Sequence, residues 1–443
     1  MNSYDVIIVG GGLAGLSGAF YLTKEKKKVL LVEAKDFVGG RTASWNEKGM
    51  LVESGLHKFL GFYTELPKLC KEAEIDFDKM LIWENEIEIR LPDGGPQAIF
   101  GASIGKPVQT LLSSIGNNDM FSLSEKAEII KLFSQATIDY AKDKESLDRI
   151  TVTGYAKKHG ISENVIQRLL IPLTEGIFFL PPEKYSMFVL ASFIGVPKFN
   201  LIKTGVGAFS GGMTEVMCQP IAEAIVRQGG EVRTGAPVEK LVIENEKVTG
   251  VVIDGKKLSA DYVVLATSLG PAQKLLKSHF ATHSWFTDLL NLPTMPAVTI
   301  QFEMKEPAMD VDHATFGPTT LLACFSEQSR TTFRHVNGRL SVILGQAEKY
   351  IKKTDKEILS DVLKDAERLH LNISEKTITD YRVITEPMDF YELSINKEKH
   401  KPTQKTPIPG LLLAGDYTKQ PYLCTMEGAT LSGKRAAEII TNI

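Results

Sequence analysis

The first residues of the chain show the hydrophobic pattern of a strand, a helix and a second strand. Residues 4–9 (YDVIIV) are a short, mainly β-branched apolar run, which is typical of a strand buried in a parallel sheet. A glycine-rich turn follows, and then an alanine- and leucine-rich segment to about Lys24 that predicts a helix. Residues 29–33 (VLLVE) predict a second strand. The pattern therefore indicates a βαβ unit of about 30 residues.

The pattern changes in the middle of the chain. Residues 70–205 carry longer helical patterns, such as 124–142, and several breaks at proline. Apolar residues dominate between 171 and 196. We expect this part to be a helical insertion whose apolar residues form a core or line a channel.

Mixed α/β patterning returns from Gly205 onward. Residues 213–228 predict a helix, and residues 270–405 alternate between helical and strand patterns. Within them, residues 397–407 are basic and contain proline, which predicts an exposed loop. Residues 410–443 read as strand, loop and helix. Three strands with turns between them are predicted at 238–244, 248–254 and 261–266.

Composition removes several classes of protein. The 443 residues include 51 Lys and Arg against 54 Asp and Glu, a net charge of -3, so the chain lacks the basic surface of a nucleic-acid binder. Its four cysteines are far apart and form no CxxC pair, which predicts neither a zinc site nor a disulfide framework and fits a reducing compartment. We expect no metal site and a cytoplasmic location.

The uncharged run at residues 6–23 resembles a membrane span in length only. Five glycines interrupt it, and neither a basic segment nor a small-residue cleavage site accompanies it. We therefore assign this run to the fold itself.

The first chemical motif is Gly10-x-Gly12-x-x-Gly15, placed between a predicted strand and a predicted helix. Glycines at these positions allow a tight turn, a close approach of a pyrophosphate to the backbone, and close helix–strand packing. The N–H groups at the start of the helix then face the phosphates. Glu33 ends the second strand, where a carboxylate can accept the ribose hydroxyls of an adenosine. The alternative is a glycine turn without a ligand.

The second motif separates FAD from NAD. Residues 39–42 (GGRT) follow shortly after Glu33 and place a guanidinium and more backbone N–H groups near a second phosphate-bearing group. That arrangement suits a large, permanently held cofactor such as FAD. The alternative is a surface turn with a solvated arginine.

The third motif lies near the end of the chain. A predicted buried strand ends at Gly415-Asp416, and a helix is predicted to begin near Thr425. Asp416 could accept a ribityl hydroxyl, and the N–H groups of the helix would face the flavin ring. Asp416 could also be the N-cap of a helix, a common position for Asp.

Together these elements predict an α/β fold with two discontinuous domains. We expect a Rossmann-type FAD-binding domain formed by residues 1–70, 205–270 and 405–443. A mixed α/β substrate-binding domain with a helical, membrane-facing part would comprise residues 71–204 and 271–404.

Several strings resemble a known family. GGGLAGL and EAKDFVGGRTASW, at residues 10–16 and 33–45, resemble the opening of the FAD-containing amine oxidase superfamily. LHKFLGFY, GDYTKQ and TMEGATLSGK, at residues 56–63, 415–420 and 425–434, are similar to the plant and cyanobacterial type of phytoene and ζ-carotene desaturases. Hydroxysqualene dehydroxylase shares much of this pattern.

The resemblance implies a set of cofactor contacts and a few residues against the substrate. Phe59, Phe62, Tyr63 and Phe179 are candidates to line a channel for an apolar substrate. The alternative, which is favoured for any single one of them, is that they belong to the core of the second domain. We assign no catalytic residue, because a lone histidine such as His57 is more often a packing or hydrogen-bonding residue. FAD contacts are expected at Gly10, Gly12, Leu13, Ala14, Gly15, Glu33, Ala34, Gly39, Gly40, Arg41, Thr42, Gly55, Leu56, His57, Val238, Ala266, Gly415, Asp416, Thr425, Met426 and Ala429.

The expected activity is desaturation or dehydrogenation of an isoprenoid, with hydride transfer from an allylic C–H to the flavin. Amine oxidases of the superfamily carry an aromatic residue where this chain has Thr425, which disfavours an amine substrate. An amine or protoporphyrinogen oxidase, a hydroxysqualene dehydroxylase, a redox-neutral polyene isomerase and a flavin-holding lipid-binding protein are the alternatives. A single dinucleotide motif indicates that a quinone or oxygen accepts the electrons, and an apolar substrate implies peripheral contact with a membrane.

Overall fold

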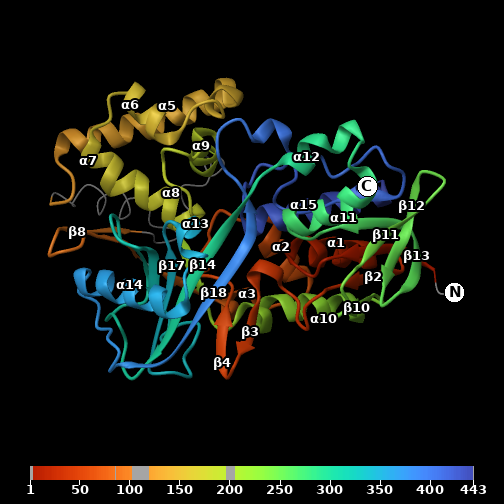
Figure 1. Cartoon of the computed structure of the whole chain (residues 1–443), viewed down its shortest axis with the longest axis horizontal. Coiled ribbons are helices and arrows are strands. Elements are labelled where there is room, and N and C mark those ends of the chain that lie inside the picture. The colour runs from red at the N-terminus through yellow and green to blue at the C-terminus, as the bar shows by residue number, and fades with distance from the viewer. Residues whose placement is uncertain (1–2, 85, 102–118, 196–204, 443) are drawn as a thin grey trace.

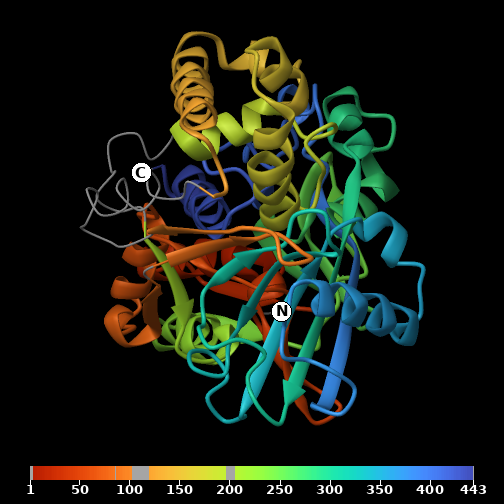
Figure 2. The same ribbon diagram turned by 90° about the vertical axis from the view of Figure 1, so that its left-hand side faces the viewer.

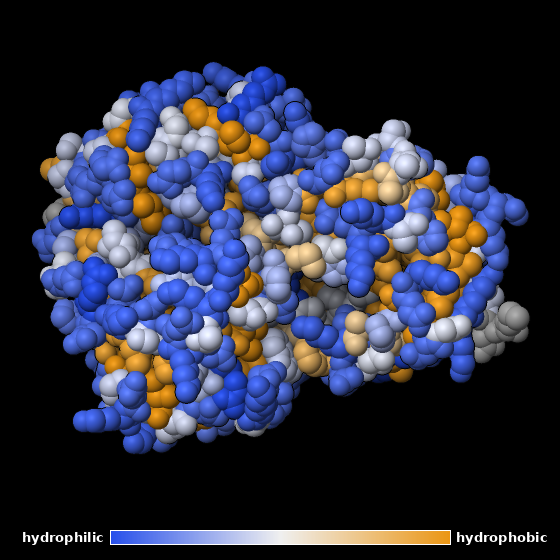
Figure 3. All heavy atoms as spheres, viewed as in Figure 1, coloured by the Kyte–Doolittle hydropathy of each residue, from blue (hydrophilic) through white to orange (hydrophobic). Residues whose placement is uncertain are grey.

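Two seven-stranded sheets and a helical part make up the structure (Figure 1). It is a computed structural model that describes residues 3–84, 86–101, 119–195 and 205–442. In Figure 2 the helical part lies above the two sheets. On the face shown in Figure 3, hydrophilic side chains cover most of the surface, and apolar side chains reach it in small groups.

The first sheet brings together strands from distant parts of the chain. Its strand order is β10-β2-β1-β13-β12-β11, and β19 pairs with β13. The pairs β10–β2, β2–β1, β1–β13 and β13–β19 are parallel, while β11–β12 and β12–β13 are antiparallel. The strands are β1 (Tyr4–Val9), β2 (Val29–Val32), β10 (Glu231–Arg233), β11 (Lys240–Glu244), β12 (Lys247–Ile253), β13 (Lys256–Leu265) and β19 (Leu411–Leu413).

Side chains of β1 alternate between two apolar cores, as expected for a strand that is buried on both faces. Val6 and Ile8 pack with α1 (Leu13–Lys24), α10 (Gln219–Arg227) and α15 (Met426–Thr441). Ile7 and Val9 belong to the core on the other face, which includes residues of β12 and of α11 (Leu269–Phe280).

The strand predicted at 261–266 is the second half of a longer one. In β13, residues 256–259 pair antiparallel with β12, and residues 260–265 pair parallel with β1. One strand thus belongs to both an antiparallel hairpin and the parallel part of the sheet. The hydrophobic pattern predicts only the buried half, because the first half is largely polar.

The second sheet is mostly antiparallel, in the order β18-β14-β17-β16-β15-β7-β8. The exception is the parallel pair β15–β7. The helices α13 (Ala347–Tyr350) and α14 (Asp355–Arg368) share the apolar core of this sheet. Its strands are β7 (Glu86–Arg90), β8 (Gln97–Gly101), β14 (Thr294–Met304), β15 (Ala314–Phe316), β16 (Leu322–Glu327), β17 (Gly338–Leu344) and β18 (Ile378–Tyr391).

Two small sheets and short elements connect these parts. β3 (Ser44–Glu47) pairs with β4 (Met50–Glu53), while β9 (Val206–Phe209) lies between β5 (Phe59–Leu60) and β6 (Leu81–Glu84). The remaining short helices are η1 (Gly40–Thr42), α2 (Glu65–Glu72), α3 (Phe77–Met80), η4 (Thr214–Cys218), η5 (Ser284–Phe286), α12 (Thr287–Asn291) and η6 (Glu398–His400).

The helical part begins with α5 (Leu123–Leu147), which is kinked at Asp143, where the backbone is not helical (φ -152°, ψ 79°). The continuous helix before the kink matches the predicted 124–142. Ser122 and Glu125 form a capping box that fixes its first turn. Tyr140 of α5 contacts Phe188 of α9, and α8 contacts β15 and β16 of the second sheet. The other helices here are α6 (Val152–Lys158), α7 (Glu163–Val165), η2 (Ile166–Leu170), α8 (Ile171–Phe178) and α9 (Met187–Gly195). Val196, predicted to lie in the apolar stretch, is outside the described residues.

Residues 397–407 are only in part the exposed loop that their composition predicts: Lys399, Thr403 and Lys405 are exposed, but several neighbours are buried. The side chain of Lys401 is 1% exposed and lies 3.4 Å from the carboxylate of Glu398. Its ammonium donates to the hydroxyl of Tyr391 at 3.0 Å and lies over that ring. Gln404 and Thr406 are also buried. Pairing and aromatic cover offset the cost of burying the charge, and single-sequence polarity cannot reveal this.

Candidate functional site

A cavity of about 1640 Å³ lies at the carboxyl ends of the parallel strands of the first sheet. Gly10 follows β1, Glu33 follows β2, Ala266 follows β13 and Gly415 follows β19 by one residue, and all four line the cavity. Ligands of open α/β sheets bind at this edge, because the strand ends and helix starts meet there. We call the part lined by these residues the polar end.

The glycine motif forms the tightest turn of the polar end. Gly10 has a φ of +112°, and a Cβ there would lie 2.8 Å from the carbonyl oxygen of Ala266. A Cβ on Gly15 would lie 1.9 Å from the carbonyl oxygen of Gly10. Gly12 precedes α1, and a Cβ added to it would have no atom nearer than 3.9 Å, so the start of the helix opens to the cavity. This turn fits a pyrophosphate held by the backbone N–H groups of α1.

The carboxylate of Glu33 is fixed beside that turn. It accepts hydrogen bonds from the backbone N–H of Gly11 at 2.6 Å and of Lys35 at 2.9 Å. The carbonyl of Glu33 accepts from Ala236, which brings Val238 to the same end of the cavity. An acid and an apolar residue at this place fit the ribose and the adenine of an adenosine.

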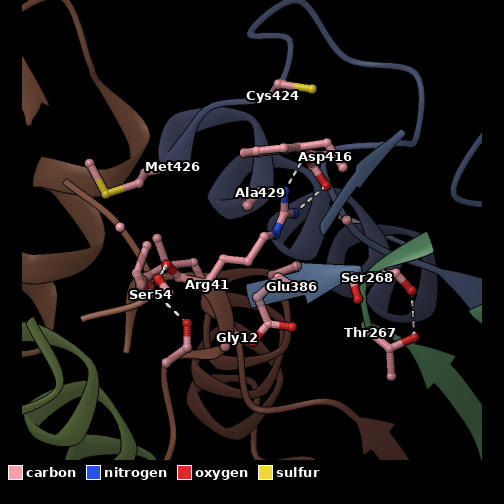
Figure 4. A pocket seen from close by; sticks show the side chains of 18 of the residues that line it. Gly12, Arg41, Ser54, Thr267, Ser268, Glu386, Asp416, Cys424, Met426 and Ala429 are labelled. Atoms are coloured by element: carbon pink, nitrogen blue, oxygen red, sulfur yellow. Dashed lines mark hydrogen bonds and ion pairs between the residues drawn. The ribbon is translucent and has the colours of Figure 1, made fainter. Parts of the chain in front are cut away.

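An ion pair crosses the middle of the cavity. The guanidinium of Arg41 donates to both carboxylate oxygens of Asp416, at 3.0 and 2.6 Å (Figure 4). It also lies 4.9 Å from the centre of the Phe390 ring. Burial alone would raise the pKa of Asp416, which is 3% exposed, but Arg41 holds that pKa below its ordinary value. Two residues separated by 375 positions thus meet at one point.

The start of α15 forms another wall of the cavity. Thr425 is its N-cap: the hydroxyl oxygen accepts from the N–H of Gly428 at 3.1 Å and the hydroxyl donates to the carbonyl of Tyr422 at 2.8 Å. Asp416 therefore is not the cap of this helix. Cys424, Met426 and Ala429 lie around the same region (Figure 4). A helix start facing the cavity favours a partly anionic ring there.

His57 lines the cavity beside Gly55 and Leu56. Its Nδ1 lies 3.0 Å from the carbonyl oxygen of Gly55. Burial lowers the pKa of His57 to about 4, and the Arg41 guanidinium acts in the same direction. The ring is therefore neutral near pH 7, and its geometry gives it a hydrogen-bonding role.

The other end of the cavity is apolar. Its side chains come from the helical part, from the second sheet and from the segments around β5 and β9. We call this part the apolar end, and it is lined by Leu60, Phe62, Ile87, Leu173, Gly176, Ile177, Phe179, Val206, Ala314, Phe316, Cys324 and Ile343. The whole cavity is larger than the usual 300–1,000 Å³ of a site for one small ligand, so it has room for a cofactor and a second molecule.

The structure brings nearly all the residues predicted for the site to this one cavity. Of the predicted cofactor contacts, only Gly15 is absent from the lining, because it packs beneath the turn of Gly10. Tyr63 and Phe179 line the cavity, as predicted for the substrate channel. Phe59 does not: it is 1% exposed and packs edge-on against Tyr63, Phe77 and Trp83.

Sequence patterns missed a second group of lining residues. Thr267 and Ser268 follow β13, and Ser268 is the N-cap of α11. A strand followed by Ser and a helical pattern is a usable signal for such a position. Phe316, Ile343 and Glu386 belong to strands of the second sheet, and no local motif marks them. Lys58 also lines the cavity, but nothing in the string LHKFLGFY distinguishes it from a surface lysine.

Comparisons with known proteins agree with this site. A family model described as flavin containing amine oxidoreductase matches residues 13–441. A 15-cis-phytoene desaturase from an Oncidium hybrid cultivar is 30% identical over 453 aligned positions, covering 98% of this chain and 77% of that protein. A zeta-carotene desaturase from Synechocystis is 27% identical over 474 positions, covering 98% of this chain and 96% of the relative.

The fold has close parallels among solved structures. Putrescine oxidase bound to putrescine superimposes with a TM-score of 0.75 at 18% identity, with 100% of both chains covered. At this identity the likeness concerns the fold alone, and it confirms the α/β fold class expected from the sequence. The extent of the family match decides the assignment: the chain belongs to the flavin-containing amine oxidoreductase family and is an FAD-dependent oxidoreductase.

Proposed function

We propose that this protein is an FAD-dependent desaturase or dehydrogenase of an isoprenoid, with chemistry like that of phytoene desaturases. The observation that carries the proposal is the apolar end of the cavity, which continues directly from the polar end. A long hydrocarbon needs a dry enclosure and few polar partners. The names of the relatives, phytoene and zeta-carotene desaturases, support the same substrate class.

The residues of the apolar end would bind and orient the substrate. Phe179, Phe316 and Ile343 would hold the chain by shape and exclude water. FAD, when bound, supplies the acceptor for a hydride from an allylic carbon. The neighbouring carbon would lose a proton as the new C=C bond forms, so that the two hydrogens removed would convert FAD to FADH2 overall. The substrate's own double bonds delocalise the developing positive charge, so a strong acid or base is not required at the carbon that gives the hydride.

Thr425 supports this proposal over oxidation of an amine. An amine needs an aromatic cage or a carboxylate to orient its nitrogen. Thr425 offers no ring, and its hydroxyl is used within the turn that begins α15. This position is therefore suited to holding the helix rather than a cationic substrate.

We propose the predicted cofactor contacts and domain division together. Glu33 and Val238 would hold the adenosine, the turn at Gly10–Gly12 the pyrophosphate, and Arg41 with Asp416 the middle of FAD. The FAD-binding domain would comprise residues 1–70, 205–270 and 405–443, and the substrate-binding domain would comprise residues 71–204 and 271–404. All seven strands of the first sheet fall in the three segments of the former, which supports this division.

Peripheral contact with a membrane is part of the proposal. Within the described ranges 3–84, 86–101, 119–195 and 205–442, no helix has the length and apolar character to cross a bilayer. The outer face of α5 exposes Leu123 (76%), Ile130 (63%) and Ile138 (45%), at spacings that place them on one side of a helix. Co-sedimentation with lipid vesicles, compared between the wild type and a Leu123→Ser, Ile130→Ser variant, tests this contact.

The proposed substrate class is tested by anaerobic mixing of the FAD-loaded protein with single compounds. Phytoene, ζ-carotene, hydroxysqualene, putrescine and protoporphyrinogen cover the alternatives. We expect an isoprenoid to bleach the flavin absorbance and to yield a product lighter by two hydrogens. A quinone or oxygen then restores the flavin absorbance.

The other outcomes are equally informative. Bleaching by putrescine or protoporphyrinogen alone would replace the proposal with the corresponding oxidase. Conversion of a polyene without a change in mass would indicate an isomerase. The hydroxysqualene dehydroxylase and the isomerase would instead use chemically reduced flavin, the first oxidising it with hydroxysqualene and the second isomerising a polyene without a change in flavin absorbance. A flavin that no compound bleaches, and that when reduced supports neither reaction, would favour a lipid-binding protein.

A further inference from the structure

One charged side chain reaches the apolar end of the cavity from the segment before β5. Lys58 lines the cavity, and its neighbours in that lining include Leu60 and Cys324. The other charged residues of the lining come from the strand ends of the first sheet, from η1, from α11 and from β18. Lys58 instead reaches residues of the second sheet. A pure hydrocarbon offers no hydrogen-bond acceptor to an ammonium group, so the position of Lys58 needs another explanation.

The partners of Lys58 hold its ammonium in place. It is hydrogen-bonded to the carboxylate of Glu84 and to the hydroxyl of Ser326 at 3.1 Å, and Asp312 lies 3.8 Å away. The side chain of Lys58 is 10% exposed, while those of Glu84 and Asp312 are 2% and 3% exposed. Burial would lower the pKa of Lys58, but Glu84 and Asp312 raise it, so the group stays charged.

The hydrogen bonds do not use all the donors of this ammonium. A lysine ammonium has three N–H groups. Glu84 and Ser326 take two of them, and the 3.8 Å separation from Asp312 is beyond hydrogen-bond length. One donor is therefore left without an assigned acceptor, and the cavity that Lys58 lines is where we look for that acceptor.

The charges around Lys58 select the kind of acceptor. Two carboxylates face one ammonium, so an additional anion would be repelled. A neutral oxygen, such as a carbonyl or a hydroxyl, can accept from the ammonium without that repulsion.

We propose that Lys58 is a specificity-determining residue that donates a hydrogen bond to a neutral oxygen carried by an otherwise apolar, isoprenoid-type ligand. The inference rests on the proposed function, because that function places such a ligand at the apolar end. Two molecules of the reaction can carry the oxygen: the compound that is oxidised, or the quinone that takes up the electrons. The shared chemistry is a single carbonyl or hydroxyl on an apolar body.

The experiment measures equilibrium binding to the oxidised, FAD-loaded protein by intrinsic fluorescence. One arm compares geranylgeraniol with the hydrocarbon in which hydrogen replaces its hydroxyl. The other arm compares a benzoquinone bearing a ten-carbon chain with the same chain on benzene. We expect the wild type to prefer the oxygenated member of at least one pair by about tenfold, the effect of one hydrogen bond to a charged donor.

The variants separate recognition from stability. Lys58→Met should abolish the preference and leave the affinity for the oxygen-free compound within about twofold. Because this change leaves Glu84 buried without its cation, the double variant with Glu84→Gln is measured as well. Glu84→Gln alone keeps the lysine and should keep the preference. Lys79→Met, which removes an exposed lysine paired with Asp76, is the matched surface control.

Each outcome decides the inference. Loss of preference for the alcohol assigns the oxygen to the oxidised compound, and loss for the quinone assigns it to the electron acceptor. A preference that survives in the double variant, or a wild type without any preference, overturns the role of Lys58. Flavin bleaching is scored separately, so an isoprenoid that binds with the expected preference but never reduces the flavin refutes the proposed function and leaves Lys58 in place.

Discussion

The two ends of the cavity are built by different means. At the polar end, glycine turns, backbone N–H groups and the Arg41–Asp416 ion pair form the wall, and apart from Arg41 on η1 they lie at strand ends of the first sheet. At the apolar end, side chains such as Leu173 and Ile343 converge from a helix and from a strand of another sheet. One end is defined by the path of the backbone and the other by the shapes of side chains.

This difference has consequences for mutation. A wall made of backbone atoms cannot adjust to a larger side chain, because an added Cβ would clash with a carbonyl group that cannot move unless its whole strand moves. A wall of side chains can repack, so substitutions there change what fits in the cavity more than whether the protein folds. Substitutions at the polar end should therefore lower the FAD content and the stability of the protein. Substitutions at the apolar end should mainly lower the rate of substrate turnover.

The largest effect is expected for Gly15→Val. Its Cβ would lie 1.9 Å from the carbonyl oxygen of Gly10, so the start of α1 would separate from the turn. We expect the variant to retain less than about a tenth of the bound FAD and to lose several kcal/mol of stability, as an overpacked buried site does. Flavin absorbance per protein and thermal unfolding measure both.

Gly49→Ala is the control for this prediction. Gly49 also has a positive φ, +93°, but no atom lies within 4 Å of the added Cβ. Its cost should be about 1 kcal/mol, with the FAD content unchanged. A Gly15→Val protein that keeps its FAD would show that the close approach is not required.

The second prediction concerns the ion pair in the middle of the cavity. Arg41→Met leaves the carboxylate of Asp416, 3% exposed, without its main cation. Removing one partner of a buried pair typically costs about 3–5 kcal/mol. We expect a lower thermal midpoint and a Kd for FAD raised by at least about tenfold, measured by titrating the deflavinated protein.

Arg368→Met is the matched comparison. Arg368 pairs with Asp93 at 2.9 Å, but their side chains are 40% and 62% exposed. Such pairs contribute about 0–1 kcal/mol. Equal losses in the two variants would mean that burial gives Asp416 no special dependence on Arg41.

The same contrast explains what could be predicted from the sequence. The βαβ unit, the Gly10 turn and the strand before Gly415 are local patterns, and each could be read within a short window. The prediction that Glu33, Arg41 and Asp416 meet followed from the rule that parallel strands end at one edge. The pairing of Arg41 with Asp416 itself could not be predicted from the sequence, because no local sequence pattern connects residues so far apart in the chain.

At the apolar end the local patterns carried much less information. Phe59 and Phe179 are both aromatic residues in apolar strings, yet Phe59 lies in the core and Phe179 lines the cavity. The difference depends on which elements pack around each ring, which is a property of the tertiary structure. Lys401 is buried for the same reason, since its partners Tyr391 and Glu398 come together only in the fold.

The third prediction uses this pair of aromatic residues. Phe179→Ala should enlarge the apolar end, keep the FAD content, and slow reduction of the flavin by an isoprenoid about tenfold, through loss of orientation. Phe59→Leu should lower the thermal midpoint by a few degrees without slowing reduction, because it removes a core ring that does not line the cavity. Stopped-flow reduction under anaerobic conditions gives the rates. Similar rates for Phe179→Ala and the wild type would place the substrate elsewhere.

A smaller effect than that of the ion pair is expected at Glu53, the last residue of β4. Its carboxylate accepts from the N–H of Met213 at 3.2 Å, and its backbone carbonyl accepts from Gln301 of the second sheet at 2.6 Å. Burial raises the pKa of Glu53 to about 7, and the opposing influence of Arg339 is weaker. Glu53 is therefore protonated in the folded protein between about pH 4.5 and 7, where the unfolded chain has lost that proton.

The sign of the pH dependence follows from this difference. The folded state binds more protons in that window, so Glu53 lowers the stability as the pH rises through it. Glu53→Gln keeps an acceptor for Met213 and removes the cost of ionisation, so its thermal midpoint relative to the wild type should be higher at pH 8 than at pH 5, by the equivalent of roughly 2 kcal/mol. Glu47→Gln, whose parent side chain on β3 is 37% exposed, should show no such change with pH. The difference in thermal midpoint between Glu53→Gln and the wild type could also be the same at both pH values. That result would mean that the carboxylate is already ionised beside Arg339 and that an ion pair, instead of a neutral hydrogen bond, holds it in place.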